Sequence, residues 1–313
     1  MNNTKINNTK TSAVSNSLLS PGHRACAGCG QIIAARIVAD TLGPQTIIAN
    51  ATGCLEVTTT PYPESSWGMP WIHSLFENAP AVASGIHAAL NYKSKVESQK
   101  SKVKVIAQGG DGSTFDIGIG LLSGMWERNE NILYICYDNE GYMNTGAQAS
   151  SATQWATNTT TTPAGIGTEI DAIGSHLFKK DMIAIALAHN LKYVAQTTIG
   201  YPLDIIAKIK KAKEINGPSY IQILVPCIPG WKIESNQTIK LAKLATQTGL
   251  YPIIEYTDGV LTSSQKINQP QTPVEAYLKQ QGRFNHLFKN ETGRKQIKFI
   301  QQIANKNIRK YNL

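Results

Sequence analysis

Four of the five cysteines are spaced so that they could ligate one metal centre. Cys26 and Cys29 are three positions apart in a glycine-containing turn, so both sulfur atoms can point at the same centre. Cys54 and Cys227 each follow a segment with the apolar pattern of a strand, and loops at strand ends commonly carry functional groups. Four thiolates suit a tetrahedral zinc ion or a [4Fe–4S] cluster, and the residues alone leave both open. The fifth cysteine, Cys136, lies inside an apolar run and is interpreted as a buried small hydrophobe.

A second group of residues could bind a diphosphate through a metal ion. A short apolar strand over 102–107 leads into Gly109–Ser113 (Gly-Gly-Asp-Gly-Ser), and the helical apolar spacing of Phe115–Arg128 follows. Glycines between a strand and a helix let the backbone approach a phosphate group, which is favoured at a helix N-terminus. Asp111 adds a carboxylate oxygen, a ligand that Mg²⁺ prefers.

The next predicted strand, Asn131–Tyr137, ends beside further oxygen donors. Mg²⁺ takes six oxygen ligands, and Asp111, the Asn139 side chain and the Gly141 carbonyl could supply the protein's share. The alternative interpretation is that the glycine-rich run is a simple turn and that Asn139 caps a helix.

Helical patterns alternate with short apolar strands along the chain. Helices are predicted over Gln31–Leu42, Glu77–Tyr92, Phe115–Arg128, Asp181–Asn190, Pro202–Ile215 and Gln237–Gln247. Strands are predicted over Thr46–Asn50, Val103–Ala107, Asn131–Tyr137, Tyr193–Thr198 and Ser219–Val225. This alternation predicts an α/β, doubly wound fold with a mainly parallel sheet and ligands at the carboxyl ends of the strands.

Several motifs closely resemble the β subunit of pyruvate:ferredoxin oxidoreductase, in the 2-oxoacid:ferredoxin oxidoreductase family. They occur in the family's order over about residues 21–255: Cys26–Gly30, Ala51–Glu56, Pro70–Ala79 and Tyr137–Gln148. In addition, a Gly-Asp-Gly turn followed one strand–helix–strand unit later by Asn is typical of thiamine-diphosphate enzymes. The resemblance therefore implies a thiamine-diphosphate-binding fold.

The resemblance implies a role for each matching residue. One [4Fe–4S] cluster would be ligated by Cys26, Cys29, Cys54 and Cys227, of which Cys54 also adjoins thiamine diphosphate. The diphosphate would be held by Gly110, Asp111, Gly112 and Ser113, and Mg²⁺ by Asp111, Asn139 and Gly141. Asn144 would reach the reacting carbon as the catalytic residue. Gln31 lies near the cofactor, where many relatives carry Glu.

The implied reaction is thiamine-diphosphate-dependent oxidative decarboxylation of pyruvate to acetyl-CoA and CO₂, with electrons passed through the cluster to ferredoxin. The substrate alternatives are 2-oxoisovalerate, 2-oxoglutarate and oxalate. The family implies α, γ and δ-type partner subunits, with the α subunit supplying the carboxylate against the pyrimidine ring. Nothing in the spacing of Glu56, Glu64 or Glu77 assigns that role to them. Two rivals are a non-redox thiamine decarboxylase with structural zinc and a basic zinc-binding interaction protein.

The charge of +9 is concentrated in the second part of the chain. Residues 1–200 carry 13 basic against 14 acidic side chains, and the remainder carries 17 against 7. We expect a flexible extension over 1–20, a cofactor-binding domain over 21–255 and a basic extension over 256–313 that docks on partner subunits. Within the extension, Arg294–Lys310 has the pattern of an amphipathic helix. No recognisable nucleic-acid module carries the charge, so no nucleic-acid partner is expected.

The N-terminal stretch is rich in Asn, Thr and Lys and lacks an apolar core, so a secretory signal is not expected. We therefore expect a cytoplasmic, reducing setting, in which disulfides are disfavoured. No stretch approaches ~20 consecutive apolar residues, so no membrane contact is expected either.

Overall fold

The computed structural model describes residues 17–313 except 62, 99–102 and 166–172. The expected N-terminal extension lies mostly outside the described residues. An eight-stranded sheet in the order β2-β1-β3-β4-β6-β5-β7-β8 forms the centre of the fold. Its strands are β1 (Thr46–Ala51), β2 (Trp71–Ser74), β3 (Lys104–Gly110), β4 (Ile132–Asp138), β5 (Tyr193–Thr198), β6 (Ser219–Leu224), β7 (Ile254–Thr257) and β8 (Val260–Ser264).

The pairing from β2 to β5 is parallel throughout, whereas β7 and β8 join the β5 edge antiparallel. Parallel strands need cover on both faces, and β4 and β6 are buried at every position. The prediction of a doubly wound, mainly parallel α/β fold is confirmed.

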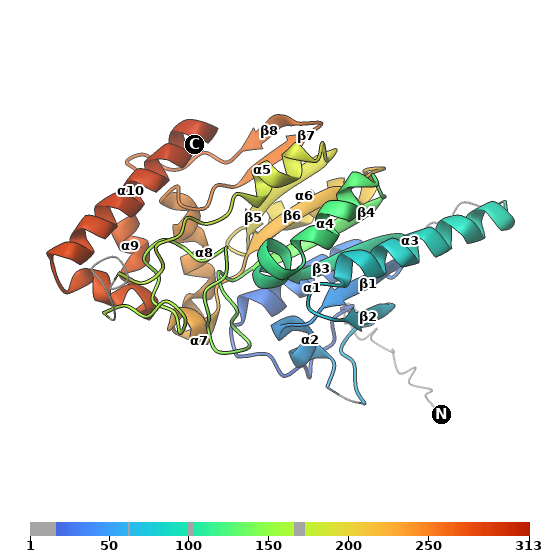
Figure 1. Ribbon diagram of the computed structural model, residues 1–313, viewed down its shortest axis with the longest axis horizontal. Helices are drawn as coiled ribbons and strands as arrows, with labels where there is room; N and C mark the ends of the chain where they lie inside the picture. Colours follow the sequence, from blue (N-terminus) through green and yellow to red (C-terminus); the bar gives the residue numbers. More distant parts are fainter. Residues whose placement is uncertain (1–16, 62, 99–102, 166–172) are drawn as a thin grey trace, which may run out of the picture.

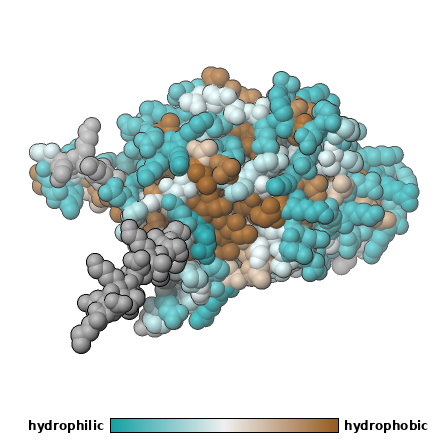
Figure 2. Space-filling model, turned by 180° about the vertical axis from the view of Figure 1, so that it is seen from behind, coloured by the Kyte–Doolittle hydropathy of each residue, from teal (hydrophilic) through white to brown (hydrophobic). Residues whose placement is uncertain are grey.

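Helices pack on both faces of this sheet (Figure 1). One face is covered by α1 (Gly30–Leu42) and α6 (Pro202–Glu214), and the other by α3 (Ala79–Val96), α4 (Ile119–Glu127) and α5 (Met182–Ala188). Figure 2 shows the reverse side, where hydrophobic residues gather in the middle of a largely hydrophilic face. No helix in the described part of the chain is long and apolar enough to cross a membrane.

The C-terminal segment is packed onto the same body. Beyond β8 it forms α9 (Val274–Leu278), η4 (Gly282–Phe288) and the amphipathic helix α10 (Glu291–Tyr311). Together with α7 (Ile228–Trp231) and α8 (Thr238–Gln247), these elements enclose a third apolar cluster. The boundary expected at residue 256 therefore falls inside β7, and docking of this segment on a partner stays a prediction.

The helix expected over Phe115–Arg128 has a different beginning. A π-helical turn, η1 (Gly112–Ile117), precedes α4, and Gly118 N donates to Ser113 O at 2.9 Å, five residues back. A Cβ at Gly118 would lie 2.3 Å from that same oxygen, so the close turn depends on glycine. Such wide turns are frequent at functional sites.

Candidate functional site

Two adjoining cavities lie at the carboxyl ends of β1, β3, β4 and β6. The first, of about 110 Å³, is bordered by the Gly109–Ser113 run and by the turn after β4. The second, of about 180 Å³, is bordered by the turn that precedes α1 and by the loop after β6. Six residues line both cavities: Gln31, Cys54, Leu55, Asn139, Met143 and Asn144. A shared wall therefore separates the two spaces.

Three oxygen-bearing groups meet in the first cavity. The Asn139 side-chain amide ends 2.7 Å from the Gly141 carbonyl oxygen and 2.9 Å from Asp111 Oδ1. With its nitrogen turned toward them, the amide donates to both acceptors. With its oxygen turned toward them, the amide oxygen lies beside a carbonyl oxygen and a carboxylate oxygen, which are ligand types that Mg²⁺ prefers. The residues present thus fit such an ion.

Asp111 is fully buried, and its environment suits a positive charge. Burial, with the nearby Asp138 carboxylate, raises the pKa of Asp111 well above its usual range. Ser150 Oγ donates to Asp111 Oδ2 at 2.5 Å and the Asn139 backbone N–H donates to Oδ1 at 3.1 Å, which partly oppose this shift. A divalent cation would favour the ionised carboxylate far more than these two donors do.

The run after β3 offers a cradle for an anionic group. Ser113 Oγ is buried and makes no well-formed hydrogen bond among the described residues, although it lies near the Tyr134 hydroxyl. A Cβ built at Gly110 would meet no described atom within 4 Å, so this backbone borders open space in the cavity. A buried hydroxyl without a well-formed hydrogen bond, beside open backbone, fits a phosphate group.

Two aromatic rings that the sequence did not single out line the same cavity. Phe76 and Tyr142 stack with ring centroids 5.8 Å apart, and Tyr142 Oη donates to Asp116 Oδ2 at 3.0 Å. Gly112 lies directly beneath this ring, because a Cβ there would come within 2.4 Å of a Tyr142 ring carbon. Both rings lie within motifs quoted above, but aromatic side chains in a motif are as typical of packing as of binding.

The second cavity is lined by all four cysteines predicted to act together: Cys26, Cys29, Cys54 and Cys227. Cys136 is buried in β4 and lines neither cavity, as expected from its apolar run. Within the described residues, no group of three or more His, Cys, Asp or Glu side chains has the geometry of a metal site. The thiols therefore share one cavity without forming a closed coordination shell.

Hydrogen bonds to backbone carbonyl groups hold the cysteine loops together. Gly30 N donates to the carbonyl of Pro226 at 3.3 Å, and Thr238 Oγ1 donates to the carbonyl of Gly28 at 2.8 Å. A Cβ at Gly28 would lie 2.2 Å from the Ser235 carbonyl oxygen, so only glycine permits this approach. The N-terminal turn is thereby fixed against the loop that carries Cys227.

The cysteine environment is apolar and thiol-rich. Burial, then the neighbouring Cys227, Cys29 and Cys26 thiols, raises the pKa of Cys54 to about 12. Burial likewise raises the pKa of Cys227 to about 12 and moves that of Cys29 upward. Without a cation the thiols are held neutral, whereas a metal centre would deprotonate them. Four thiols around one cavity fit a zinc ion or an iron–sulfur cluster.

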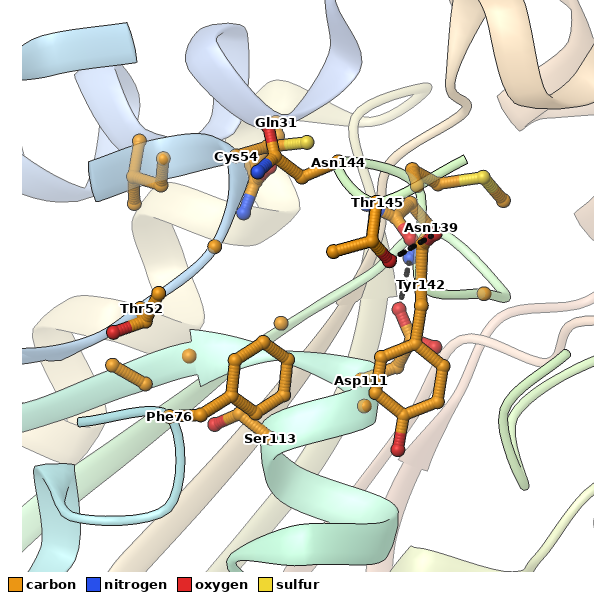
Figure 3. A pocket seen from close by; sticks show the side chains of 18 of the residues that line it. Gln31, Thr52, Cys54, Phe76, Asp111, Ser113, Asn139, Tyr142, Asn144 and Thr145 are labelled. Carbon is orange, nitrogen blue, oxygen red and sulfur yellow. Dashed lines mark hydrogen bonds between the residues drawn. The ribbon is translucent and has the colours of Figure 1, made fainter. Parts of the chain in front are cut away.

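Asn144 and Gln31 lie where the cavities meet. Figure 3 shows both beside Cys54 at one end of the first cavity, while Asp111 and Ser113 lie at the other end. The motif residues are thus brought together, with the anion cradle on one side of the shared wall, Cys26, Cys29 and Cys227 on the other, and Cys54 in the wall itself.

Comparisons with known proteins identify the family of this chain. The family described as thiamine pyrophosphate enzyme, C-terminal TPP binding domain, matches residues 51–223. The pyruvate synthase subunit PorB of Methanosarcina barkeri is 51% identical over 295 residues, which cover 94% of this chain and 97% of the relative. The chain belongs to the PorB family of oxidoreductase subunits. This family assignment confirms the resemblance, and with it a thiamine-diphosphate-binding domain.

Relatives of the PorB family carry other substrate names. The ketoisovalerate oxidoreductase subunit VorB of Pyrococcus abyssi is 41% identical over 278 residues, which cover 86% of each chain. A solved structure of 2-oxoglutarate:ferredoxin oxidoreductase from Magnetococcus marinus, with 2-oxoglutarate, coenzyme A and succinyl-CoA bound, matches with a TM-score of 0.52. It is 23% identical and covers 70% of this chain and 76% of that chain, so it supports the fold alone.

Proposed function

We propose that this chain is the β subunit of a 2-oxoacid:ferredoxin oxidoreductase that acts on pyruvate. The 2-oxoacid and coenzyme A would give an acyl-CoA, CO₂ and one proton, while two electrons leave to ferredoxin. Bound thiamine diphosphate supplies the electron sink for decarboxylation, and a [4Fe–4S] cluster supplies a one-electron acceptor. The observation that carries the proposal is the wall shared by the Asp111 cavity and the four-cysteine cavity.

The residues of the first cavity would bind and orient the cofactor. The backbone of Gly110 and Gly112 would approach the diphosphate, and Ser113 Oγ would donate a hydrogen bond that it lacks within the described chain. Asp111, Asn139 and the Gly141 carbonyl would ligate Mg²⁺ through the three oxygen atoms described above.

The residues of the shared wall would surround the reacting part of the bound cofactor. Asn144 lines both cavities and could donate its amide N–H to the substrate, with Gln31 beside it. Leu55 and Met143 are apolar and would exclude water between the two cofactors. Cys26, Cys29 and Cys227 on the far side of this wall, together with Cys54 in the wall, would ligate the [4Fe–4S] cluster.

The pyrimidine carboxylate would come from another chain. Glu56, Glu64 and Glu77 line neither cavity, which supports a carboxylate from outside this chain. The relatives' names describe subunits, which supports an assembly. We infer α, γ and δ-type partner subunits, and electron delivery to ferredoxin by the complete complex.

Pyruvate is the first substrate candidate because the Methanosarcina relative is named a pyruvate synthase subunit. 2-Oxoisovalerate is favoured next by the VorB relative, followed by 2-oxoglutarate and oxalate. The test is anaerobic ferredoxin reduction by the assembled complex with each acid and coenzyme A. Reduction with pyruvate at the highest kcat/KM supports the proposal. Preference for another acid would change the substrate, and CO₂ release without ferredoxin reduction would favour a non-redox thiamine enzyme.

A further inference from the structure

Two residues from the C-terminal part of the chain hold the turn that carries Asn139. Trp231 Nε1 donates to the Asn139 carbonyl oxygen at 2.8 Å, and Arg283 Nη2 donates to Glu140 Oε2 at 2.7 Å. The Arg283 guanidinium also lies over the Trp231 ring, 3.8 Å from the ring centroid. Trp231, Arg283 and Glu140 are all buried, so these contacts are shielded from water.

Glu140 adopts a backbone conformation that its side-chain partners must support. Its φ is +66°, a left-handed value that is uncommon for residues other than glycine. Its backbone N–H donates to Asp138 Oδ1 at 3.2 Å, and its carboxylate also accepts from Lys179 at 3.1 Å and Gln154 at 2.9 Å. Strained conformations of this kind persist where surrounding contacts fix them. The turn is thus fixed from outside the cavity.

Trp231 also contacts the cysteine loop. It ends α7, which begins directly after Cys227, and its backbone N–H donates to the Cys227 carbonyl oxygen at 2.9 Å. One residue therefore contacts both Cys227, on the side of the second cavity, and Asn139, in the shared wall.

We propose that Trp231 and Arg283 are positioning residues that set the Asn139–Gly141 turn against Asp111 and at a fixed distance from Cys227. Neither residue lines either of the two cavities described above, so both would act through the turn without touching a ligand there. The inference deepens the proposed function and rests on it, because it assumes that the turn ligates Mg²⁺.

Trp231→Phe is the decisive variant, since phenylalanine keeps an aromatic ring for packing and removes the indole N–H. It is made in the assembled complex together with Arg283→Met, which removes the guanidinium. The measurement is the Mg²⁺ concentration that half-saturates thiamine diphosphate binding, determined by calorimetry below the unfolding temperature. Both variants should raise it about 10-fold or more, the usual effect of losing a residue that orients a metal ligand. The iron content should stay at the parent value, because the Trp231 backbone bond to Cys227 remains.

Arg128→Met is the matched control. Arg128 Nε donates to Glu130 Oε1 at the same 2.7 Å, but the Arg128 side chain is 53% exposed. The control should need the same Mg²⁺ concentration as the parent for half-saturation of thiamine diphosphate binding. A merely structural role would lower the unfolding temperature of the variants and leave the Mg²⁺ half-saturation unchanged, which would overturn the inference.

The controls separate the possible failures. If Arg283→Met does not fold, Trp231→Phe alone decides, and a parent-like titration of that variant overturns the inference. If the parent complex binds no thiamine diphosphate, the proposed function fails first and the inference falls with it.

Discussion

The Asn139 side-chain amide ends 2.9 Å from Asp111 Oδ1, although the two residues leave different strands. Gly110, the last residue of β3, pairs with Tyr137 near the end of the adjacent parallel strand β4. The residues that follow these strands must therefore meet at the same edge of the sheet. Two side chains that could each offer an oxygen ligand to a metal ion come together there because the sheet is parallel.

Removal of the Asp111 carboxylate should affect the binding of one cofactor and not of the other. We expect Asp111→Ala to lose retention of thiamine diphosphate while the iron content stays close to that of the parent. The physical reason is that Asp111 lines the first cavity and not the one lined by the four cysteines. Thiamine and iron analyses of the purified complex check this. Equal loss of both would show that Asp111 has a structural role only.

A methyl group at Gly110 should block the anion cradle without disturbing the fold. Gly110→Ala meets no described atom within 4 Å, so its free energy of unfolding should change by less than about 0.5 kcal/mol. The methyl group borders the cavity, and thiamine diphosphate affinity should fall about tenfold or more, equivalent to about 1.4 kcal/mol.

Gly120→Ala is the control for this change. Gly120 also has open space around it but lies on the exposed side of α4, and alanine is favoured over glycine in a helix by about 1 kcal/mol. This variant should bind thiamine diphosphate normally. Parent-like affinity in both variants would place the diphosphate elsewhere.

The two kinds of cysteine should respond differently to serine. Cys227→Ser should lose or destabilise the cluster, because Cys227 lines the second cavity. Cys136→Ser should keep its iron and lose about 1–3 kcal/mol of unfolding free energy, since a hydroxyl would be buried in β4. Iron analysis and thermal unfolding of both variants distinguish the two roles. Full iron content in the Cys227 variant would assign the fourth ligand elsewhere.

Asn144 should matter for turnover and not for cofactor binding. Its side chain lies at the Cys54 end of the first cavity, away from Asp111 and Ser113 (Figure 3). Asn144→Ala should retain thiamine diphosphate, Mg²⁺ and iron but lose roughly 10²–10³ in kcat, as when a preorganised amide donor is removed. Ferredoxin reduction within about threefold of the parent rate would mean that Asn144 has only a structural role in the turn.

Local sequence patterns predicted the elements that position the site, because apolar periodicity and strand ends are encoded locally. The short helix α2 (Cys54–Thr59) was missed, since its Val and Thr residues favour strands. In the structure Thr58 and Thr59 donate to the carbonyls of Cys54 and Leu55, four residues back. Such bonds satisfy threonine hydroxyls within a helix.

The antiparallel hairpin β7–β8 was also missed, although its turn carries a readable signal. Asp258 and Gly259 have φ values of +48° and +77°, the left-handed pair that an Asp-Gly turn favours. The contact between Arg283 and Glu140 could not be predicted, because it joins residues 143 positions apart and no local pattern records such a pairing. Long-range buried charge pairs depend on the tertiary fold.

In the proposed reaction, electrons cross the wall between the two cavities. The most direct test mixes the anaerobically purified complex with pyruvate, without ferredoxin, and follows the broad visible absorbance of its iron–sulfur clusters. We predict rapid bleaching in the parent and none in the Cys26→Ser variant, since Cys26 lines the second cavity. Release of CO₂ with unchanged absorbance in the parent, or bleaching that persists in the Cys26 variant, would mean that electrons do not pass to a cluster held by these cysteines.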